Sequence, residues 1–160
     1  MTTSVGRLFD GVAAILGIVQ RTTFEGQAAV ALEKLALDAG PVEPYPIDIR
    51  EQADLPFKIG WESLIRNLVK DIEAGMPKPK IAAAFHETMA EAVLLAAKQI
   101  GEKRVLLTGG CFQNAILLER SIAKLSASGF QPFWHSRVPP NDGGIALGQL
   151  VAGLKSVPVY

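Results

Sequence analysis

Two glycines that follow an apolar run are the clearest candidates for a ligand contact in this sequence. Residues 104–108 (RVLLT) predict a buried strand that runs into Gly109 and Gly110, and a helix is expected from Gln113 to about Ser126. Glycine lets a ligand approach the main chain, and a helix N-terminus attracts anions. The pattern therefore indicates a phosphate contact, with the amide of Asn114 free in the first helical turn. It lacks the GK[ST] of a P-loop, so an ordinary strand–turn–helix connection stays open.

Asp142, in the segment VPPNDGGIALGQ, is a second candidate for a ligand contact. Pro139 and Pro140 predict an extended approach to a final helix, preceded by a short strand at about 130–134. Asn141 or Asp142 could cap that helix, and cap preferences favour this role. The carboxylate of Asp142 could instead bind Mg²⁺ or another metal beside a phosphate. The glycines that follow, at 143, 144 and 148, predict close packing on one face of the helix.

The N-terminal part of the sequence contributes three further polar candidates. Apolar spacing predicts a helix over residues 4–17, with Asp10 off its apolar face. A second helix is predicted from Gly26 to about Ala39, and Glu25 and Gly26 at its start form a candidate ligand contact. The alternative is a solvated acid beside the positive end of the helix, and the residues by themselves favour it.

His86 and Cys111 are the other residues whose side chains could react. His86 lies beside Phe85 in a long helix predicted over residues 80–100. We interpret it as a core or boundary histidine with one hydrogen bond rather than as a catalytic group. Cys111 has no base or cation beside it in the sequence, so we interpret it as a small buried hydrophobe rather than a nucleophile.

The composition narrows the class of protein. The 160 residues suffice for one domain with a core, and sixteen acidic residues balance sixteen basic ones, which argues against a nucleic-acid partner. No apolar run approaches the ~20 residues of a membrane span, and no signal-peptide pattern opens the sequence. One cysteine excludes an internal disulfide and fits a reducing compartment, so we expect a cytoplasmic location.

The order of the predicted elements indicates the fold class. Four helices, the third at 61–74, precede a strand–helix–strand–helix succession. Between the second and third helices, residues 42–60 predict two short strands in a hairpin-like excursion. The succession predicts an α/β fold with a parallel strand pair near the C-terminal end, in a single domain over residues 1–160.

Five segments carry a resemblance to a known family: SVGRLFDGVAAILG, FEGQAAVALEKLA, IAAAFHETMAEAV, TGGCFQNAILLE and GFQPFWHSRVPPNDGGIALGQ. In these residues and in their order, the chain resembles the C-terminal end of the HypF carbamoyltransferases, which mature [NiFe]-hydrogenases. The O-carbamoyltransferases of antibiotic synthesis and the tRNA threonylcarbamoyl transferases share the GG…N pattern and the later aspartate. The resemblance covers nearly the whole chain.

The resemblance implies a fold and a reaction. The fold is the actin/Hsp70/sugar-kinase (ASKHA) type, of which this chain would be the second ribonuclease-H-like lobe, helix-rich with a small mixed sheet. The reaction uses carbamoyl phosphate and ATP, passes through carbamoyl adenylate, and transfers the carbamoyl group to the C-terminal cysteine of HypE. That group later becomes a cyanide ligand of iron.

The resemblance also implies roles for particular residues. Main-chain contacts to the ATP phosphates would come from Gly109 and Gly110, with Asn114 beside them. Asp10, Glu25 and Gly26 would lie at the adenosine end. Asp142 would bind a divalent metal (Mg²⁺, or Fe or Zn), so the resemblance favours a ligand role over the cap.

HypF proteins are several times longer than this chain. We therefore expect one lobe, without the preceding lobe and without the histidine pair that would complete the metal site with Asp142. We expect no carbamoyl transfer from the isolated chain. Two alternatives stay open: a non-catalytic module that docks on a partner or forms a homodimer through an uncovered apolar face, and an O-carbamoyltransferase acting on a small hydroxyl substrate.

Overall fold

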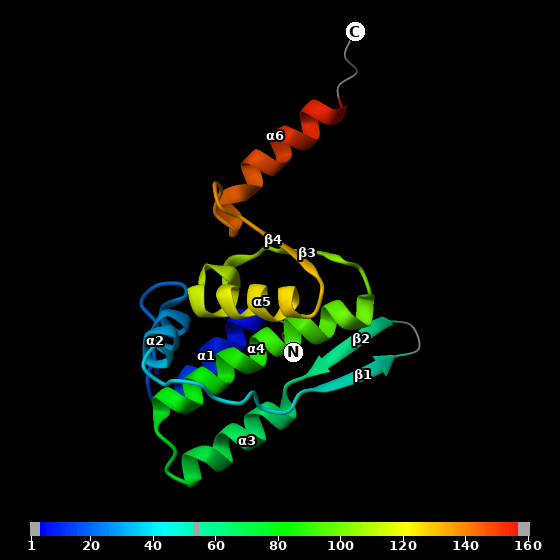
Figure 1. Ribbon diagram of the computed structural model, residues 1–160. Helices are drawn as coiled ribbons and strands as arrows, with labels where there is room; N and C mark the ends of the chain where they lie inside the picture. The colour runs from blue at the N-terminus through cyan, green and yellow to red at the C-terminus, as the bar shows by residue number, and fades with distance from the viewer. Residues whose placement is uncertain (1–3, 53–54, 157–160) are drawn as a thin grey trace.

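Helices form most of the molecule, and α4 (Lys78–Ile100) runs through its centre (Figure 1). The computed structural model describes residues 4–52 and 55–156. The main contacts of α4 are with α2 (Gln27–Ala36), α3 (Glu62–Glu73) and α5 (Ala115–Ala127). α1 (Val5–Ile15) packs on α2 and touches α4 through Phe9. The four helices predicted before residue 101 are confirmed, and their ends differ from the predicted ones by a few residues.

The sequence of α4 explains its central position. Phe85 packs edge-on against Phe9 of α1, with ring centroids 4.8 Å apart. Pro79 stands in the first turn, where its missing N–H is not needed, and Gly101 ends the helix with φ 82°. Small side chains let neighbouring helices approach closely, and five alanines of α4 are buried, at 82, 83, 84, 90 and 97.

Four strands complete the described part of the chain. The predicted hairpin is present as β1 (Asp48–Gln52) and β2 (Leu55–Gly60), which pair antiparallel. The predicted parallel pair is present as β3 (Arg104–Leu107) and β4 (Gln131–Trp134). The expectation of one mixed sheet is wrong for the described residues, because the two pairs form separate two-stranded sheets.

The prediction that β3 is buried is also wrong. Leu107 is 2% exposed and packs with Leu94 of α4 and Leu125 of α5, whereas Leu106 on the opposite face is 62% exposed. A two-stranded sheet that is covered by helices on one face leaves the other face open. Phe133 of β4 is likewise exposed.

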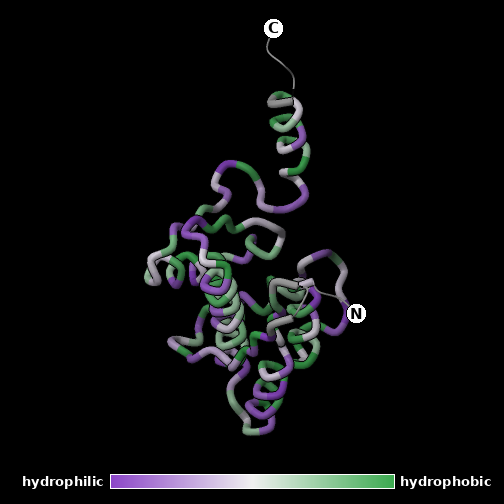
Figure 2. The backbone as a smooth tube through the Cα atoms, turned by 90° about the vertical axis from the view of Figure 1, so that its right-hand side faces the viewer, coloured by the Kyte–Doolittle hydropathy of each residue, from purple (hydrophilic) through white to green (hydrophobic). Residues whose placement is uncertain are grey.

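The last helix, α6 (Ile145–Ser156), projects away from the body (Figures 1 and 2). The predicted close packing against its glycines is wrong at Gly148, where an added Cβ would meet no atom within 4 Å. The predicted close packing is confirmed at Gly144, just before the helix, because an added Cβ there would lie 2.9 Å from the Pro139 carbonyl oxygen. Apolar side chains of α6 are exposed, Leu154 by 68%. No helix in the described ranges, α6 included, has the length and apolarity to cross a membrane.

Candidate functional site

A cavity of about 750 Å³ lies where α1, the start of α2, the turn after β3 and the segment before α6 meet. Its volume falls in the range typical of small-molecule sites. Six of the seven residues predicted for the site line it: Asp10, Glu25, Gly26, Gly110, Asn114 and Asp142. Segments far apart in the sequence therefore converge on one place, while the roles of these residues stay predictions.

Gly109 stands behind the cavity wall and joins two of its segments. It adopts φ 106°, a backbone conformation that favours glycine, and its N–H donates to the Pro140 carbonyl oxygen at 2.8 Å. This hydrogen bond ties the end of β3 to the segment that carries Asp142. A side chain at Gly109 would strain the backbone at this junction.

The turn after β3 differs from the predicted strand-to-helix connection. Residues Gly110–Gln113 form one turn of 3₁₀ helix, and α5 begins at Ala115 rather than at Gln113. Phe112 N–H donates to the Gly109 carbonyl oxygen. Within the described residues, the N–H groups of Gly110 and Cys111 make no hydrogen bond. Both residues line the cavity, so their amides are available there as main-chain donors to an anion.

Asn114 is the N-cap of α5, and the expectation of a free amide in the first helical turn is wrong. Its Oδ1 accepts from the N–H of Leu117 at 2.9 Å, and its Nδ2 lies 3.0 Å from Nε2 of His86. The side chain is buried, with 6% of the residue exposed. Asn114 therefore keeps one N–H of its Nδ2 group for a ligand.

His86 is fully buried on α4, which confirms the prediction of a core histidine, with two hydrogen bonds instead of one. Its Nδ1 lies 2.7 Å from the Ala82 carbonyl oxygen. A carbonyl oxygen can only accept, so the proton is on Nδ1 and Nε2 accepts from Asn114. Burial lowers the pKa of His86, and the Ala82 hydrogen bond opposes this effect only in part. The ring is neutral at pH 7.

Glu33 of α2 is a site residue that the sequence analysis missed. Its Oε1 accepts from the N–H groups of Ala115 at 2.6 Å and Ile116 at 3.3 Å. The carboxylate thus occupies the N-terminus of α5, where the sequence predicted free donors for a phosphate. Glu33 and Ala115 are 82 residues apart, and no local pattern announces the contact.

Asn141 takes the cap role that the sequence left open between two residues. Its Oδ1 accepts from the N–H of Gly143 at 3.0 Å, at the start of the 3₁₀ turn Asp142–Gly144. Asp142 is exposed and lines the cavity. Its carboxylate makes no hydrogen bond or ion pair among the described residues, which leaves it available. Residues 4–52 and 55–156 contain no group of three His, Cys, Asp or Glu side chains that could hold a metal ion.

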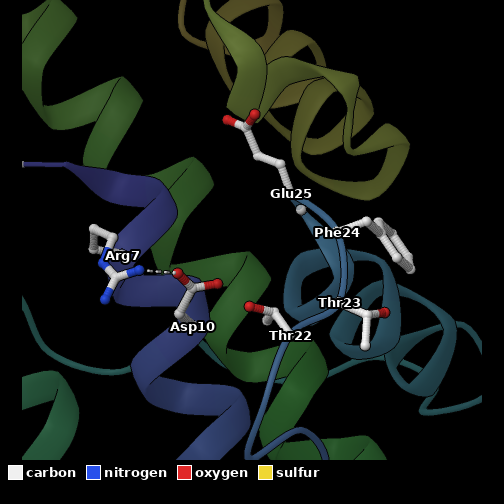
Figure 3. A pocket seen from close by; sticks show the side chains of 7 residues that line it. Arg7, Asp10, Thr22, Thr23, Phe24 and Glu25 are labelled. Atoms are coloured by element: carbon white, nitrogen blue, oxygen red, sulfur yellow. Dashed lines mark hydrogen bonds and ion pairs between the residues drawn. The ribbon is translucent and has the colours of Figure 1, made fainter.

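A smaller pocket of about 310 Å³ adjoins the cavity and shares residues with it (Figure 3). Arg7 and Asp10, both on α1, form an ion pair at 3.0 Å. Figure 3 shows Glu25 directed away from this pair, with Thr22 between Asp10 and the loop that leads to α2. The pocket therefore offers hydroxyl, carboxylate and guanidinium groups close together, a set suited to a polar ligand.

Acidic side chains outnumber basic ones around the cavity. Arg7 is the one cation among its lining residues, whereas Asp10, Glu25, Glu33 and Asp142 are carboxylates. Like charges within a few ångströms repel strongly where water is partly excluded. A polyphosphate would therefore need a cation beside it in this cavity.

These features describe a small, helix-rich α/β protein with a polar cavity at a glycine turn. Residues 1–149 match the family model for the carbamoyltransferase Kae1-like domain, second subdomain, and the chain belongs to this family. The resemblance noted in the sequence is confirmed.

The relatives that this chain matches are longer proteins, and it aligns with part of each. It is 38% identical to the carbamoyltransferase HypF of Synechocystis sp. over 98% of its length, and 40% identical to that of Rhodobacter capsulatus over 97%. A tRNA N6-adenosine threonylcarbamoyltransferase of Thermus thermophilus is 35% identical over 73% of the chain. The chain spans about a fifth of the HypF proteins, 20% of each of these two.

A solved structure gives the same correspondence in three dimensions. The chain superposes on full-length HypF in its phosphate- and nucleotide-bound form with a TM-score of 0.83 and 42% identity. The match covers 95% of this chain and 20% of that protein. HypF of T. kodakarensis superposes with a TM-score of 0.76 and 29% identity.

Proposed function

We propose that this chain forms one wall of the nucleotide cleft in a HypF-type carbamoyltransferase. The reaction uses carbamoyl phosphate and ATP, proceeds through carbamoyl adenylate, and carbamoylates the C-terminal cysteine of HypE for the cyanide ligands of [NiFe]-hydrogenase. One observation carries the proposal: residues from four separate segments, selected from the sequence for ATP and metal binding, line a single cavity. The nucleotide-bound state of the similar HypF structure supports it.

The proposed roles follow from the groups that remain free. The amides of Gly110 and Cys111 and the remaining N–H of Asn114 would donate to phosphate oxygens. Asp10, Glu25 and Gly26 would contact the adenosine end, where carboxylates accept from ribose hydroxyls. Glu33 would act indirectly, because it fixes the start of α5 behind Asn114.

The proposed metal site would be completed from outside this chain. Asp142 fits a divalent cation, because its carboxylate is exposed in the cavity and has no partner within the described residues. It supplies one ligand, and a stable site for Mg²⁺, Fe or Zn requires several. The preceding lobe would contribute the others. We therefore propose that the isolated chain does not turn over carbamoyl phosphate.

The exposed apolar surface of α6 and of the β3–β4 sheet supports a contact with the rest of the enzyme. Leu106, Phe133, Leu150 and Leu154 are each at least half exposed. Apolar patches of this kind mark association sites. The same observation favours a second candidate, a non-catalytic module that dimerises through this surface. An O-carbamoyltransferase for a small hydroxyl substrate would use the same cavity and differ in residues outside this chain.

Calorimetric titration of the chain with ATP and Mg²⁺ tests the proposal. We expect saturable binding that Asp142→Ala and Gly110→Pro weaken, the latter by removing one main-chain donor. Glu119→Ala is the matched control, since Glu119 is exposed on α5 and its side chain makes no hydrogen bond or ion pair within the described ranges. Equal affinity in all variants would refute the assignment of these residues. Turnover of carbamoyl phosphate by the isolated chain would refute the need for a second lobe.

A further inference from the structure

We propose that His86 is a positioning residue for the cavity: it fixes the side chain of Asn114 in the orientation that leaves one N–H for a ligand. His86 does not line the cavity, whereas Asn114 does. Only the consequence of this orientation, a contact between Asn114 and a nucleotide, rests on the proposed function. The orientation itself is a property of the chain and can be measured without any ligand.

The orientation of the Asn114 amide follows from which of its neighbours can only accept a hydrogen bond and which can only donate one. At one end the Ala82 carbonyl oxygen can only accept, so Nδ1 of His86 carries the proton. At the other end the Leu117 main-chain N–H can only donate, so the oxygen of the Asn114 amide faces it. The two requirements meet at the contact between Nδ2 of Asn114 and Nε2 of His86, where a donor faces an acceptor.

Any other arrangement places like groups against each other. If the Asn114 amide turned over, its oxygen would face the lone pair of Nε2 and its NH₂ group would face the Leu117 N–H. Both hydrogen bonds would then be lost in a buried site that water cannot repair, since His86 is 0% and Asn114 6% exposed. If instead the proton moved from Nδ1 to Nε2 of His86, the hydrogen bonds of the ring to Ala82 and to Asn114 would be lost.

The surroundings of His86 hold its ring in place. Phe9 and Phe85 stand edge-on to it, with centroids 5.4 and 5.9 Å away. Phe9 also lines the cavity, so the aromatic contact connects the histidine to the cavity wall. The charged groups that act on the ring are Glu33 of α2 and Arg120 of α5, and their effects oppose each other. The position therefore favours a neutral, immobile acceptor behind Asn114.

Two variants separate positioning from simple core packing. His86→Gln can preserve both bonds, because its amide NH₂ can donate to Ala82 and its oxygen can accept from Asn114. His86→Leu fills a similar volume but offers no acceptor. A residue that matters only for packing would tolerate Leu better than the polar Gln. A positioning residue requires the reverse order.

Nitrogen-15 NMR of the histidine ring and of the Asn114 side-chain amide measures the orientation directly. We expect a neutral His86 with protonated Nδ1 and unprotonated Nε2, and an Asn114 side-chain N–H, the one hydrogen-bonded to Nε2, protected from solvent exchange. His86→Leu should lose that protection, and His86→Gln should keep it, while circular dichroism shows both folded. Protonated Nε2, or unchanged protection of the amide in His86→Leu, would overturn the proposal.

A second measurement connects the orientation to the ligand. In titrations with ATP and Mg²⁺, His86→Leu should weaken binding about tenfold, a loss that Asn114→Ala should reproduce and that the double variant should not exceed. Additive losses would show that His86 acts independently of Asn114 and would overturn the inference. If no form of the chain binds ATP, nucleotide binding by this lobe fails, and the NMR result still decides the positioning.

Discussion

Replacing Glu33 by Ala should destabilise the chain, although Ala is the better helix former. The substitution removes an acceptor for two main-chain N–H groups at the start of α5, one at 2.6 Å and one at 3.3 Å. A charged hydrogen bond at a helix N-terminus contributes about 1.5–3 kcal/mol when shielded and less when exposed. Ala115 is exposed, so water can replace part of the loss. We expect a loss of about 2 kcal/mol.

Urea unfolding, followed by circular dichroism, measures this loss as a free energy of unfolding. For a chain of this length, about 2 kcal/mol corresponds to a melting temperature lower by about 4–8 °C. Glu33→Gln keeps an acceptor oxygen and loses the charge, so it should recover about half of the loss. Glu119→Ala is the matched control on α5 and should change stability by less than about 0.5 kcal/mol.

Two results would refute this reasoning. If Glu33→Ala unfolds within about 0.5 kcal/mol of the unmodified chain, the carboxylate does not cap α5 in solution. If Glu33→Gln is as unstable as Glu33→Ala, the charge is the whole interaction and the hydrogen-bond geometry contributes nothing. If Glu119→Ala lowers the free energy of unfolding as much as Glu33→Ala does, the effect comes from removing an acidic side chain in general and not from the cap of α5.

Three further predictions concern other parts of the chain. Tyr45→Phe removes the hydroxyl that donates to Asp71 at 2.7 Å and should cost about 1–2 kcal/mol in urea unfolding, with unchanged circular dichroism. Because burial lowers the pKa of His86, the unfolded chain binds a proton more readily. Stability should therefore fall as the pH drops below about 6.5, a fall that His86→Gln reduces. Leu150→Lys with Leu154→Lys should leave stability unchanged and convert any dimer to a monomer in size-exclusion chromatography with light scattering.

Local signals in the sequence were enough to predict most elements. The sequence predicts helices that end at about residues 17, 74 and 100, and a glycine with a positive φ follows each observed helix: Gly17, Gly75 and Gly101. In the helix predicted over residues 61–74, Leu64 and Leu68 lie four residues apart and both are fully buried. These predictions succeeded because a helix end and a helix face depend on residues a few positions apart.

Several errors concern contacts between distant residues. His86 and Asn114 are 28 positions apart, and their hydrogen bond occupies one N–H of the amide that was expected to be free. The exposure of Leu106 depends on how many strands flank β3, which its own sequence does not encode. Sequence patterns selected the residues around the cavity, but the groups that remain free to bind follow only from their partners.

The charges around the cavity bear on the proposed need for a metal ion and a second lobe. Four carboxylates face one guanidinium, and the Arg7 charge is already paired with Asp10. A nucleotide triphosphate adds several negative charges, so this wall would repel it unless cations intervene. The two amides of the glycine turn and the one N–H of Asn114 are neutral donors, so they do not offset this repulsion. A cleft built in this way makes affinity depend on a metal ion, and an opposing lobe that supplied further metal ligands would strengthen binding and complete the set of reacting groups.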